Sequence, residues 1–289
     1  KRQYLPDNLD NYMPALLYSF PGSGNTWCRL LLDYATGIYS GSFFHDSKLF
    51  DSLPGEVKCD RTVSIIKAHP HLQPYYNISL FNQSNMHYSD EIVDKCHMNG
   101  LNNFTRAILL VRNPYDAFWS EFQRRGSKSH ILGRLKAETS ITRINYNKRT
   151  LPIKYIQMWE RDYKAFMIHG ETLLVKYEDL RNNSVRIKEL NKMIEFLKLP
   201  SNYYSDLQKT EKIRKLQCAF KLSEKPSVHR MNITITRNES LYIQKDEFFT
   251  YETVCEMWKV LRNHSEPLGY KPYKNYNCDN YNKTADYIE

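Results

Sequence analysis

Short apolar runs that alternate with longer helical stretches constrain the fold of this chain most strongly. Four runs have the length of buried strands: Ala15–Phe20, Thr62–Lys67, Arg106–Arg112 and Thr172–Lys176. Helical stretches lie between and after them: Thr26–Ala35, Tyr115–Arg124, Ile153–Ile168, Val185–Leu197 and Tyr251–Arg262. Such alternation is typical of a mainly parallel sheet that helices cover on both faces. We therefore predict an α/β fold whose ligands bind beyond the carboxyl ends of the strands.

The organisation of the chain favours a single domain. Its 289 residues contain no internal repeat, no low-complexity tract and no linker rich in Pro, Gly or Ser. We expect one domain over residues 1–289, with a core over about residues 15–273. The basic stretch at residues 126–150 has two interpretations, as a lid or acceptor-binding segment and as a solvated excursion.

The formal net charge is +9, which indicates either simple solubility or an anionic ligand. Lys and Arg are spread along the chain and no nucleic-acid-binding motif is present, so we expect no nucleic-acid partner. No apolar run reaches the ~18 residues that a spanning helix needs. We expect that any membrane anchor lies outside this sequence.

The N-glycosylation acceptor triplets and the cysteines of the sequence both indicate the secretory pathway. The Asn-x-Ser/Thr triplets begin at Asn77, Asn82, Asn103, Asn182, Asn232, Asn238, Asn263 and Asn282. The six cysteines fit an oxidising lumen and allow 15 pairings, among which the sequence does not choose. Cys28 follows a helical pattern with Leu31 and Leu32, which favours a buried thiol. No Cys-x-x-Cys pair occurs, so we predict no metal site.

The segment Pro21-Gly22-Ser23-Gly24-Asn25-Thr26 joins the first apolar strand to a helix. Backbone N–H groups at a helix N-terminus suit an anion, and Gly22 and Gly24 let the backbone approach it closely. Ser23, Asn25 and Thr26 add side-chain donors. An ordinary capped turn would explain the same residues. The GxxxxGK[ST] signature is absent, which disfavours ATP or GTP hydrolysis.

Two other strand ends carry candidate site residues. Arg112 ends one strand and Ser120 lies two turns into the next helix, so both could bind one dianionic group. A surface arginine paired with Asp116 or Glu121 is the alternative. Lys67 and His69 share one face of another strand, where an imidazole could remove a hydroxyl proton and an ammonium could stabilise a leaving oxygen. Taken alone, His69 also fits an ordinary loop histidine.

Together these segments resemble the family of sulfotransferases that use 3'-phosphoadenosine 5'-phosphosulfate (PAPS). The first signature of that family matches "FPGSGNTW" and the second matches Arg112 with Ser120. Its Lys-x-His segment matches Lys67-Ala68-His69. The segments "LLVKYEDL" and "MWKVLRNHSEPLGYKPY" resemble its Tyr-Glu-Asp element and its closing helix. The resemblance implies a P-loop-NTPase-like sulfotransferase fold.

The resemblance also implies roles for these residues. The loop Gly22, Ser23, Gly24, Asn25 and Thr26 would hold the 5'-phosphosulfate, while Arg112 and Ser120 would hold the 3'-phosphate. Tyr177 would lie near the adenine with Trp27 on its other side. His69 would be the general base, and PAPS would be the co-substrate with no metal.

One departure from the family concerns the loop. Many sulfotransferases carry a lysine where this chain has Gly22, and that lysine assists the bridging oxygen as it leaves. Lys67 is our preferred substitute because it shares a strand face with His69, and Arg29 is the second choice. The last phosphate-binding loop of the family is not clearly matched, and Arg230 is its candidate here.

Within the family, "SFPGSGNTW" followed by "ATGIYSGS" is most similar to the WSC-domain sialate O-sulfotransferases, which are Golgi membrane proteins. The resemblance covers only their catalytic domain. It implies an O-sulfotransferase of the Golgi lumen, anchored as a type II membrane protein, that acts on an anionic glycan such as sialic acid. The alternatives are a catalytically silent lumenal protein that binds a nucleotide or a glycan, a protein-tyrosine sulfotransferase, and a kinase.

Overall fold

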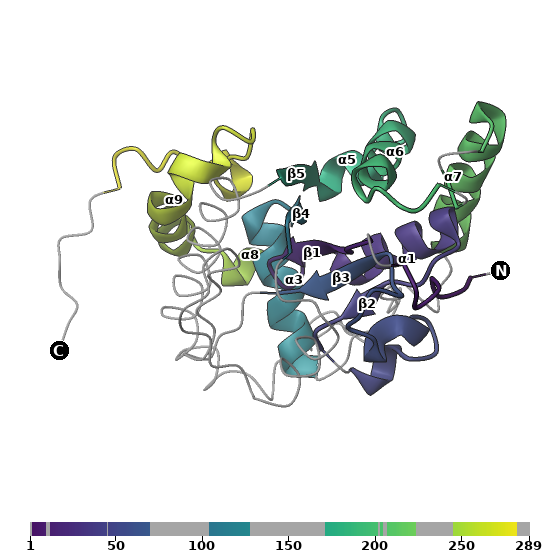
Figure 1. Ribbon diagram of the computed structural model, residues 1–289. Coiled ribbons are helices and arrows are strands. Elements are labelled where there is room, and N and C mark those ends of the chain that lie inside the picture. Colours follow the sequence, from purple (N-terminus) through teal and green to yellow (C-terminus); the bar gives the residue numbers. More distant parts are fainter. Residues whose placement is uncertain are drawn as a thin grey trace, which may run out of the picture.

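The computed structural model describes residues 2–9, 12–44, 46–69, 104–127, 171–201, 203–204, 207–223 and 245–281. Its centre is a five-stranded sheet in the order β2-β3-β1-β4-β5, in which every neighbouring pair is parallel (Figure 1). The strands are β1 (Ala15–Ser19), β2 (Gly41–Ser42), β3 (Ile65–Ala68), β4 (Arg106–Val111) and β5 (Glu171–Lys176). The predicted parallel α/β fold is therefore confirmed.

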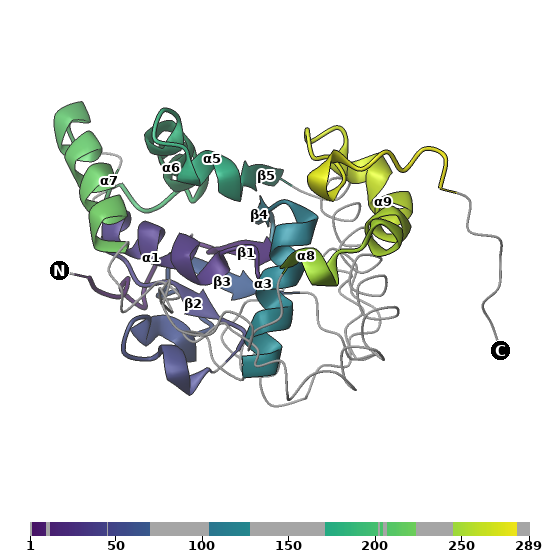
Figure 2. The same ribbon diagram turned by 180° about the vertical axis from the view of Figure 1, so that it is seen from behind.

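Helices connect and cover these strands. They are α1 (Asn25–Thr36), α3 (Pro114–Ser127), α5 (Tyr177–Arg181), α6 (Arg186–Phe196), α7 (Lys209–Ser223), α8 (Lys245–Phe248) and α9 (Tyr251–Ser265). Three short 3-10 turns are η1 (Ser47–Leu49), η2 (Pro54–Val57) and η5 (Tyr273–Asn275). Helices α7 and α9 lie at opposite ends of the described part of the molecule (Figures 1 and 2).

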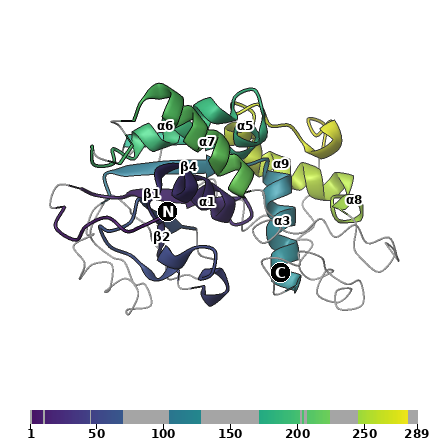
Figure 3. The same cartoon turned by 90° about the vertical axis from the view of Figure 1, so that its right-hand side faces the viewer.

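The sheet separates two apolar cores because successive side chains of a strand point to opposite faces. On one face, Leu17 and Ile108 pack with residues of α1, α6 and α7 such as Phe220. Figure 3 shows α7 beside α1 and α6 on this face. On the other face, Leu16 packs with residues of α3, α8 and α9, including Phe118. Burial on both faces explains why the strands read as continuous apolar runs.

The segment after α8 is tied to the last residue of β5 and to helix α5, which follows that strand. The phenol of Tyr270 donates to Glu178 Oε2 at 2.8 Å, and the ammonium of Lys176 donates to the carbonyl of Leu268. Within the segment, a disulfide joins Cys255 of α9 to Cys278. These links hold the C-terminal segment against the end of β5.

The other described cysteines divide into bonded and free. Cys59 is also disulfide-bonded, whereas Cys28 and Cys218 are free thiols. Cys28 is fully buried, as predicted, and burial raises the pKa of its thiol to about 12.

Predicted and observed bounds agree within one or two residues for most elements. The strand predicted at Thr62–Lys67 begins three residues later, at Ile65, so its predicted start was wrong. Thr62 instead closes a turn, because its backbone N–H donates to Asp60 Oδ1 at 2.9 Å. The helix predicted at Ile153–Ile168 lies outside the described residues. Among the helices that the structure does describe, none has the length and hydropathy to cross a bilayer.

Candidate active site

The predicted site residues gather where the parallel strands end. Each of β1, β3, β4 and β5 is followed directly by a segment that carries at least one of them. Residues 20–24 follow β1, His69 follows β3, Arg112 follows β4 and Tyr177 follows β5. Because all four strands are parallel, these segments lie along one edge of the sheet.

The loop after β1 is shaped by two left-handed glycines. Gly22 has a φ of 86° and Gly24, which caps α1, has a φ of 93°. Few other residues adopt these angles without strain. The first turn of α1 contains no acidic side chain, so no residue of that turn offsets the positive end of the helix dipole. The loop therefore offers backbone N–H groups and a partial positive charge to an anion.

Ser23 provides a test of whether this loop suits an anionic group. Its hydroxyl is buried and has no hydrogen-bond partner among the residues that the structure describes. A buried polar group without a partner costs about 1–3 kcal/mol, and an anion oxygen could accept from this hydroxyl. Asn25 serves the loop differently, because its side-chain N–H₂ donates to Leu17 O at 3.2 Å and to Ser19 Oγ at 3.1 Å. The loop residues thus fit a phosphate or sulfate group.

Arg112 lies against the same loop. Its guanidinium donates to the carbonyl of Gly22 at 2.8 Å and lies over the ring of Tyr177, 4.5 Å from the centroid. The ring of Tyr177 in turn packs on Gly24, where an added Cβ would lie 2.6 Å from two ring carbons. The loop, Arg112 and Tyr177 therefore form one cluster.

Helix α3 brings Ser120 to the neighbourhood of this cluster. Gly22 packs against the backbone of α3 so closely that an added Cβ would lie 2.2 Å from Ala117 O and 3.0 Å from Glu121 N. Ser120 lies in that turn of α3 and is partly buried. The structure therefore places Arg112, Ser120 and the loop on one side of the molecule, as the phosphate-binding prediction requires.

Trp27 packs between Tyr177 and helix α7. Its indole N–H donates to Ser223 Oγ of α7 at 3.1 Å, and its ring meets that of Tyr177 edge to face with centroids 5.5 Å apart. The two rings thus contact each other and do not face each other across a gap. Arg181, which the sequence analysis did not single out, holds its guanidinium 5.5 Å from the centroid of Trp27.

His69 is held by the end of β1. Its Nδ1 lies 2.8 Å from the carbonyl oxygen of Ser19. A carbonyl only accepts, so Nδ1 carries the proton and Nε2 carries the lone pair in the neutral ring. Although His69 is partly exposed, burial of its ring and, to a smaller extent, the nearby charge of Lys67 together lower its pKa to about 3. The imidazole is therefore neutral at physiological pH.

Lys67 has a buried counter-ion that the sequence analysis missed. Its ammonium lies 3.3 Å from Glu56 Oε1, and the other oxygen of Glu56 accepts from Arg29. Lys67 and His69 both lie near the ring of Phe44, whose centroid is 5.5 Å from Lys67 Nζ and 5.7 Å from the centroid of the His69 ring. Arg29, the second choice for the missing loop lysine, is fully buried and bonded to Ser40 and Glu56. These bonds occupy the guanidinium of Arg29, so it does not serve the loop.

The other predicted residues are Thr26 and Arg230. Thr26 is partly buried in the first turn of α1. Arg230 lies outside the described residues. The described ranges contain no group of three or more His, Cys, Asp or Glu side chains that could hold a metal ion.

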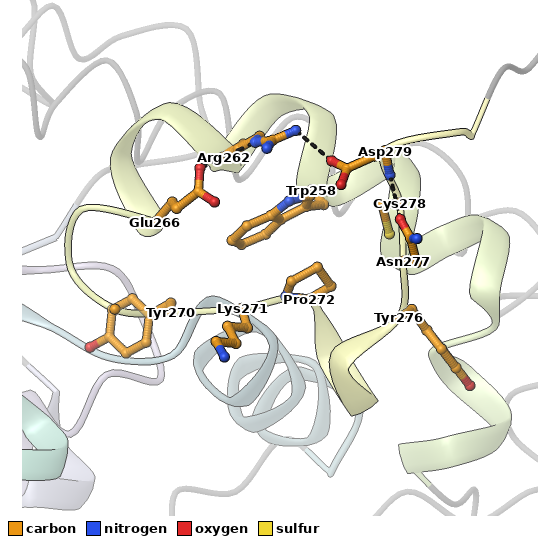
Figure 4. Close-up of a pocket in the computed structure, with 11 residues that line it drawn as sticks. Trp258, Arg262, Glu266, Tyr270, Lys271, Pro272, Tyr276, Asn277, Cys278 and Asp279 are labelled. Atoms are coloured by element: carbon orange, nitrogen blue, oxygen red, sulfur yellow. Dashed lines mark hydrogen bonds and ion pairs between the residues drawn. The ribbon is translucent and has the colours of Figure 1, made fainter.

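A separate hollow of about 290 Å³ lies in the C-terminal segment (Figure 4). Trp258 lies between Arg262 and Pro272 in this view, and Arg262 donates to Asp279 at 2.7 Å. None of the predicted site residues lines it. Tyr270, which does line it, connects it to the end of β5 through Glu178.

Comparison with known proteins agrees with this geometry. The sulfotransferase domain family matches residues 14–264. The chain belongs to the sulfotransferase family. This sulfotransferase domain is 33% identical over 195 residues to a WSCD family member of Drosophila melanogaster. The aligned region covers 66% of the chain and 52% of that relative. A WSCD family member of Aedes aegypti is 30% identical over 192 residues, covering 64% of the chain and 50% of the relative.

The domain thus spans about half the length of the curated relatives that it matches. The family as a whole uses PAPS as its sulfate donor. The fold of this chain, a five-stranded parallel sheet between helices, is the fold that the sequence resemblance implied.

Proposed function

We propose that this domain transfers a sulfuryl group from PAPS to a hydroxyl of an anionic glycan in the secretory pathway. The observation that carries the proposal is the direct contact between Arg112 and Gly22 at an edge that also holds His69. A donor with phosphate groups at both ends needs cationic or N–H-rich groups at two places in one crevice. The arrangement of the loop and Arg112 supplies both.

Donor binding follows from the chemistry of these groups. The N–H groups of the loop and the Ser23 hydroxyl would bind the 5'-phosphosulfate, while Arg112 and Ser120 would bind the 3'-phosphate. Tyr177 offers its ring to the adenine beside Arg112. Binding energy at the 3'-phosphate would fix the position of the distant sulfuryl group.

His69 would act as the general base. Its Nε2 takes the proton of the acceptor hydroxyl as the hydroxyl oxygen forms a bond to sulfur. The bond from sulfur to the bridging oxygen breaks, and adenosine 3',5'-bisphosphate leaves. The free domain lowers the pKa of His69, but the negative charges of a bound donor would raise it again. The pKa of His69 would therefore rise, and His69 would become a stronger base, only when the donor is bound.

The acceptor and the compartment are inferred from composition. A net charge of +9 suits an anionic acceptor such as sialic acid or a sulfated polysaccharide. Eight acceptor triplets and a disulfide fit the Golgi lumen, with a type II anchor elsewhere in the protein. Asn182 and Asn263, two of these asparagines, are exposed in the structure. Both could carry a glycan without unfolding the domain.

A second candidate is a lumenal protein that binds the nucleotide or a glycan without catalysis. Gly22 favours it, because the amino group that many family members place there is absent. Protein-tyrosine sulfation differs from our proposal only in the acceptor. A kinase is disfavoured because the GxxxxGK[ST] signature is missing.

The test is incubation with labelled PAPS, a panel of sialylated, sulfated and neutral glycans, and a tyrosine peptide, with ATP as the control donor. We expect label on an anionic glycan. Label on the peptide alone would indicate tyrosine sulfation, and consumption of ATP would indicate a kinase. Tight binding of adenosine 3',5'-bisphosphate without any transfer would indicate the silent protein.

His69→Ala tests the proposed base directly. Turnover should fall by roughly a hundredfold or more, because no other group at this position would take the proton. Calorimetry should show unchanged affinity for adenosine 3',5'-bisphosphate. His264→Ala on α9 is the matched control and should keep full turnover. Wild-type turnover in His69→Ala would remove this residue from the mechanism.

A further inference from the structure

A buried ionic cluster lies next to the proposed base. Glu56, on η2, is fully buried and accepts from three side chains: Arg29 of α1, Ser42 of β2 and Lys67 of β3. The hydroxyl of Ser42 donates to Oε1 at 3.0 Å, and Lys67 approaches the same oxygen at 3.3 Å. Both carboxylate oxygens are therefore engaged, and the cluster joins the helix after the donor loop to the strand before His69.

The fixed geometry of Glu56 comes from Arg29. The Nε of Arg29 donates to Ser40 Oγ at 3.0 Å, and one of its terminal nitrogens donates to the Ser40 carbonyl at 3.1 Å. The remaining terminal nitrogen bonds Glu56. A guanidinium held at three points is a rigid anchor, so the carboxylate that it binds is rigid too.

Lys67 depends on this carboxylate for its charge. The side chain of Lys67 is only 7% exposed, and burial lowers the pKa of its ammonium. Arg29 lowers this pKa as well, whereas Glu56 raises it and Asp46 raises it less. His69, partly exposed and neutral at physiological pH, is the titratable group beside Lys67 at the end of β3. Glu56 is thus the main group that keeps the ammonium protonated.

We propose that Glu56 is a positioning residue for sulfuryl transfer, which holds the ammonium of Lys67 charged and beside the reacting groups. The proposal rests on the proposed function. In this arrangement Lys67 supplies the positive charge that Gly22 cannot. Glu56 and Arg29 form the buried ion pair that holds the ammonium of Lys67 in place. When the phosphosulfate binds, its negative oxygens compete with Glu56 for the ammonium. Because Lys67 is already protonated, its positive charge can stabilise the phosphosulfate without a prior proton transfer.

The alternative is a merely structural role, in which Glu56 only joins α1 to the β2–β3 side of the sheet. The two roles differ in their dependence on Lys67. A structural carboxylate lowers activity whether or not Lys67 is present, whereas a positioning carboxylate has no effect on kcat once the ammonium is gone.

A double-mutant cycle separates these roles. Lys67→Met should lower kcat roughly a hundredfold, and Glu56→Gln should lower it roughly tenfold. We expect Glu56→Gln to cause less than about a twofold further loss in the Lys67→Met background. Equal losses in both backgrounds, or wild-type kcat in Glu56→Gln, would overturn the proposal. If wild-type protein transfers no sulfuryl group, the proposed function fails instead.

The pKa of Lys67 gives a readout that needs no acceptor. The carbon-13 signal of its ε-methylene, assigned with Lys67→Met, reports the protonation of the ammonium as pH changes. We expect Glu56→Gln to lower the pKa of Lys67 by about one unit or more, which corresponds to about 1.4 kcal/mol. An unchanged pKa would overturn the proposal.

Asp33→Asn is the matched control. Asp33 is also fully buried and lies close to Arg29, but its carboxylate accepts from the backbone N–H of Ser40 at 2.9 Å and not from Lys67. This variant should keep wild-type kcat. If Glu56→Gln does not fold, Glu56→Asp, which keeps the charge and withdraws it by one methylene, enters the same cycle under the same criteria.

Discussion

Gly22, in the loop between β1 and α1, has no room for a side chain. Its φ of 86° belongs to the left-handed region, and the backbone of α3 occupies the place of a Cβ. Its carbonyl accepts from Arg112, so its orientation is fixed as well. The glycine at this position is therefore part of how this loop packs on α3. In the function that we propose, a cation that serves the leaving oxygen would therefore come from another element.

Replacing Gly22 by lysine tests this view. Gly22→Lys adds an amino group to the loop, yet we expect it to abolish transfer, because the new Cβ would collide with Ala117 O. Gly22→Ala should have nearly the same effect on turnover and on thermal stability. Gly269→Ala is the control, since Gly269 also has a positive φ of 80° but open space where an added Cβ would lie. Higher turnover in Gly22→Lys would contradict this explanation.

Arg112 makes a prediction about donor affinity. Arg112→Ala removes a charge-assisted bond and the contact with Tyr177, so affinity for adenosine 3',5'-bisphosphate should fall roughly tenfold to a hundredfold. Arg112→Lys should recover only part of it, because an ammonium lacks the fork geometry. Calorimetry measures both, with Arg262→Ala on α9 as the control. Unchanged affinity in Arg112→Ala would exclude it as the anchor.

Among the elements, those with a strong local pattern could be predicted from the sequence. β1, β4 and β5 are apolar runs of strand length, and α9 begins after Thr250, whose hydroxyl accepts from the N–H of Thr253. The two-residue β2 could not be predicted, because only its pairing with β3 defines it. α7 had a readable signal in Leu216, Ala219, Phe220 and Ser223, which share one buried face.

The same contrast holds for the candidate site. His69, Arg112 and Tyr177 could be predicted because each follows an apolar run, and parallel strands bring their ends together. Glu56 could not, because it lies on a short 3-10 turn and its partners are set by how β2 and β3 pair. The contact between Trp27 and Ser223 spans 196 residues and depends on the placement of α7.

The segment held by the Cys255–Cys278 disulfide gives a prediction at the scale of elements. This bond closes a loop across 23 residues, so Cys255→Ser with Cys278→Ser should lower the free energy of unfolding by about 3 kcal/mol. Urea denaturation measures the change. Cys218→Ser is the control, because Cys218 is an exposed free thiol. Equal stability of the double variant and the wild type would show that the contacts of Tyr270 and Lys176 hold the segment by themselves.

For the whole molecule, buried charge links stability to pH. Burial raises the pKa of Asp33 from 3.8 to about 7, although Arg29 and the bonds from Ser40 limit the rise. The folded state therefore binds this proton more tightly than the unfolded chain does. The stabilisation is complete below about pH 4 and is lost as pH rises to about 7, by at most about 1.4 kcal/mol per pH unit.

Asp33→Asn should remove this dependence. Because asparagine does not titrate, the variant should lose less stability than the wild type between about pH 4 and pH 7. Urea denaturation at several pH values compares the two profiles. Parallel profiles would show that another group causes the pH dependence of the wild type.

The attachment of the C-terminal segment has a consequence for biosynthesis. Both sheet-side partners of that segment, Lys176 and Glu178, flank the end of β5, and Glu178 also accepts from the backbone N–H of Asn113 beside Arg112. A nascent chain that has emerged only as far as α7 can already pair its strands, but Tyr270 has not yet been made. The segment that follows α7 in the chain thus completes the edge where the donor would bind, so we expect a chain cut short before Tyr270 to lack these supports at the site.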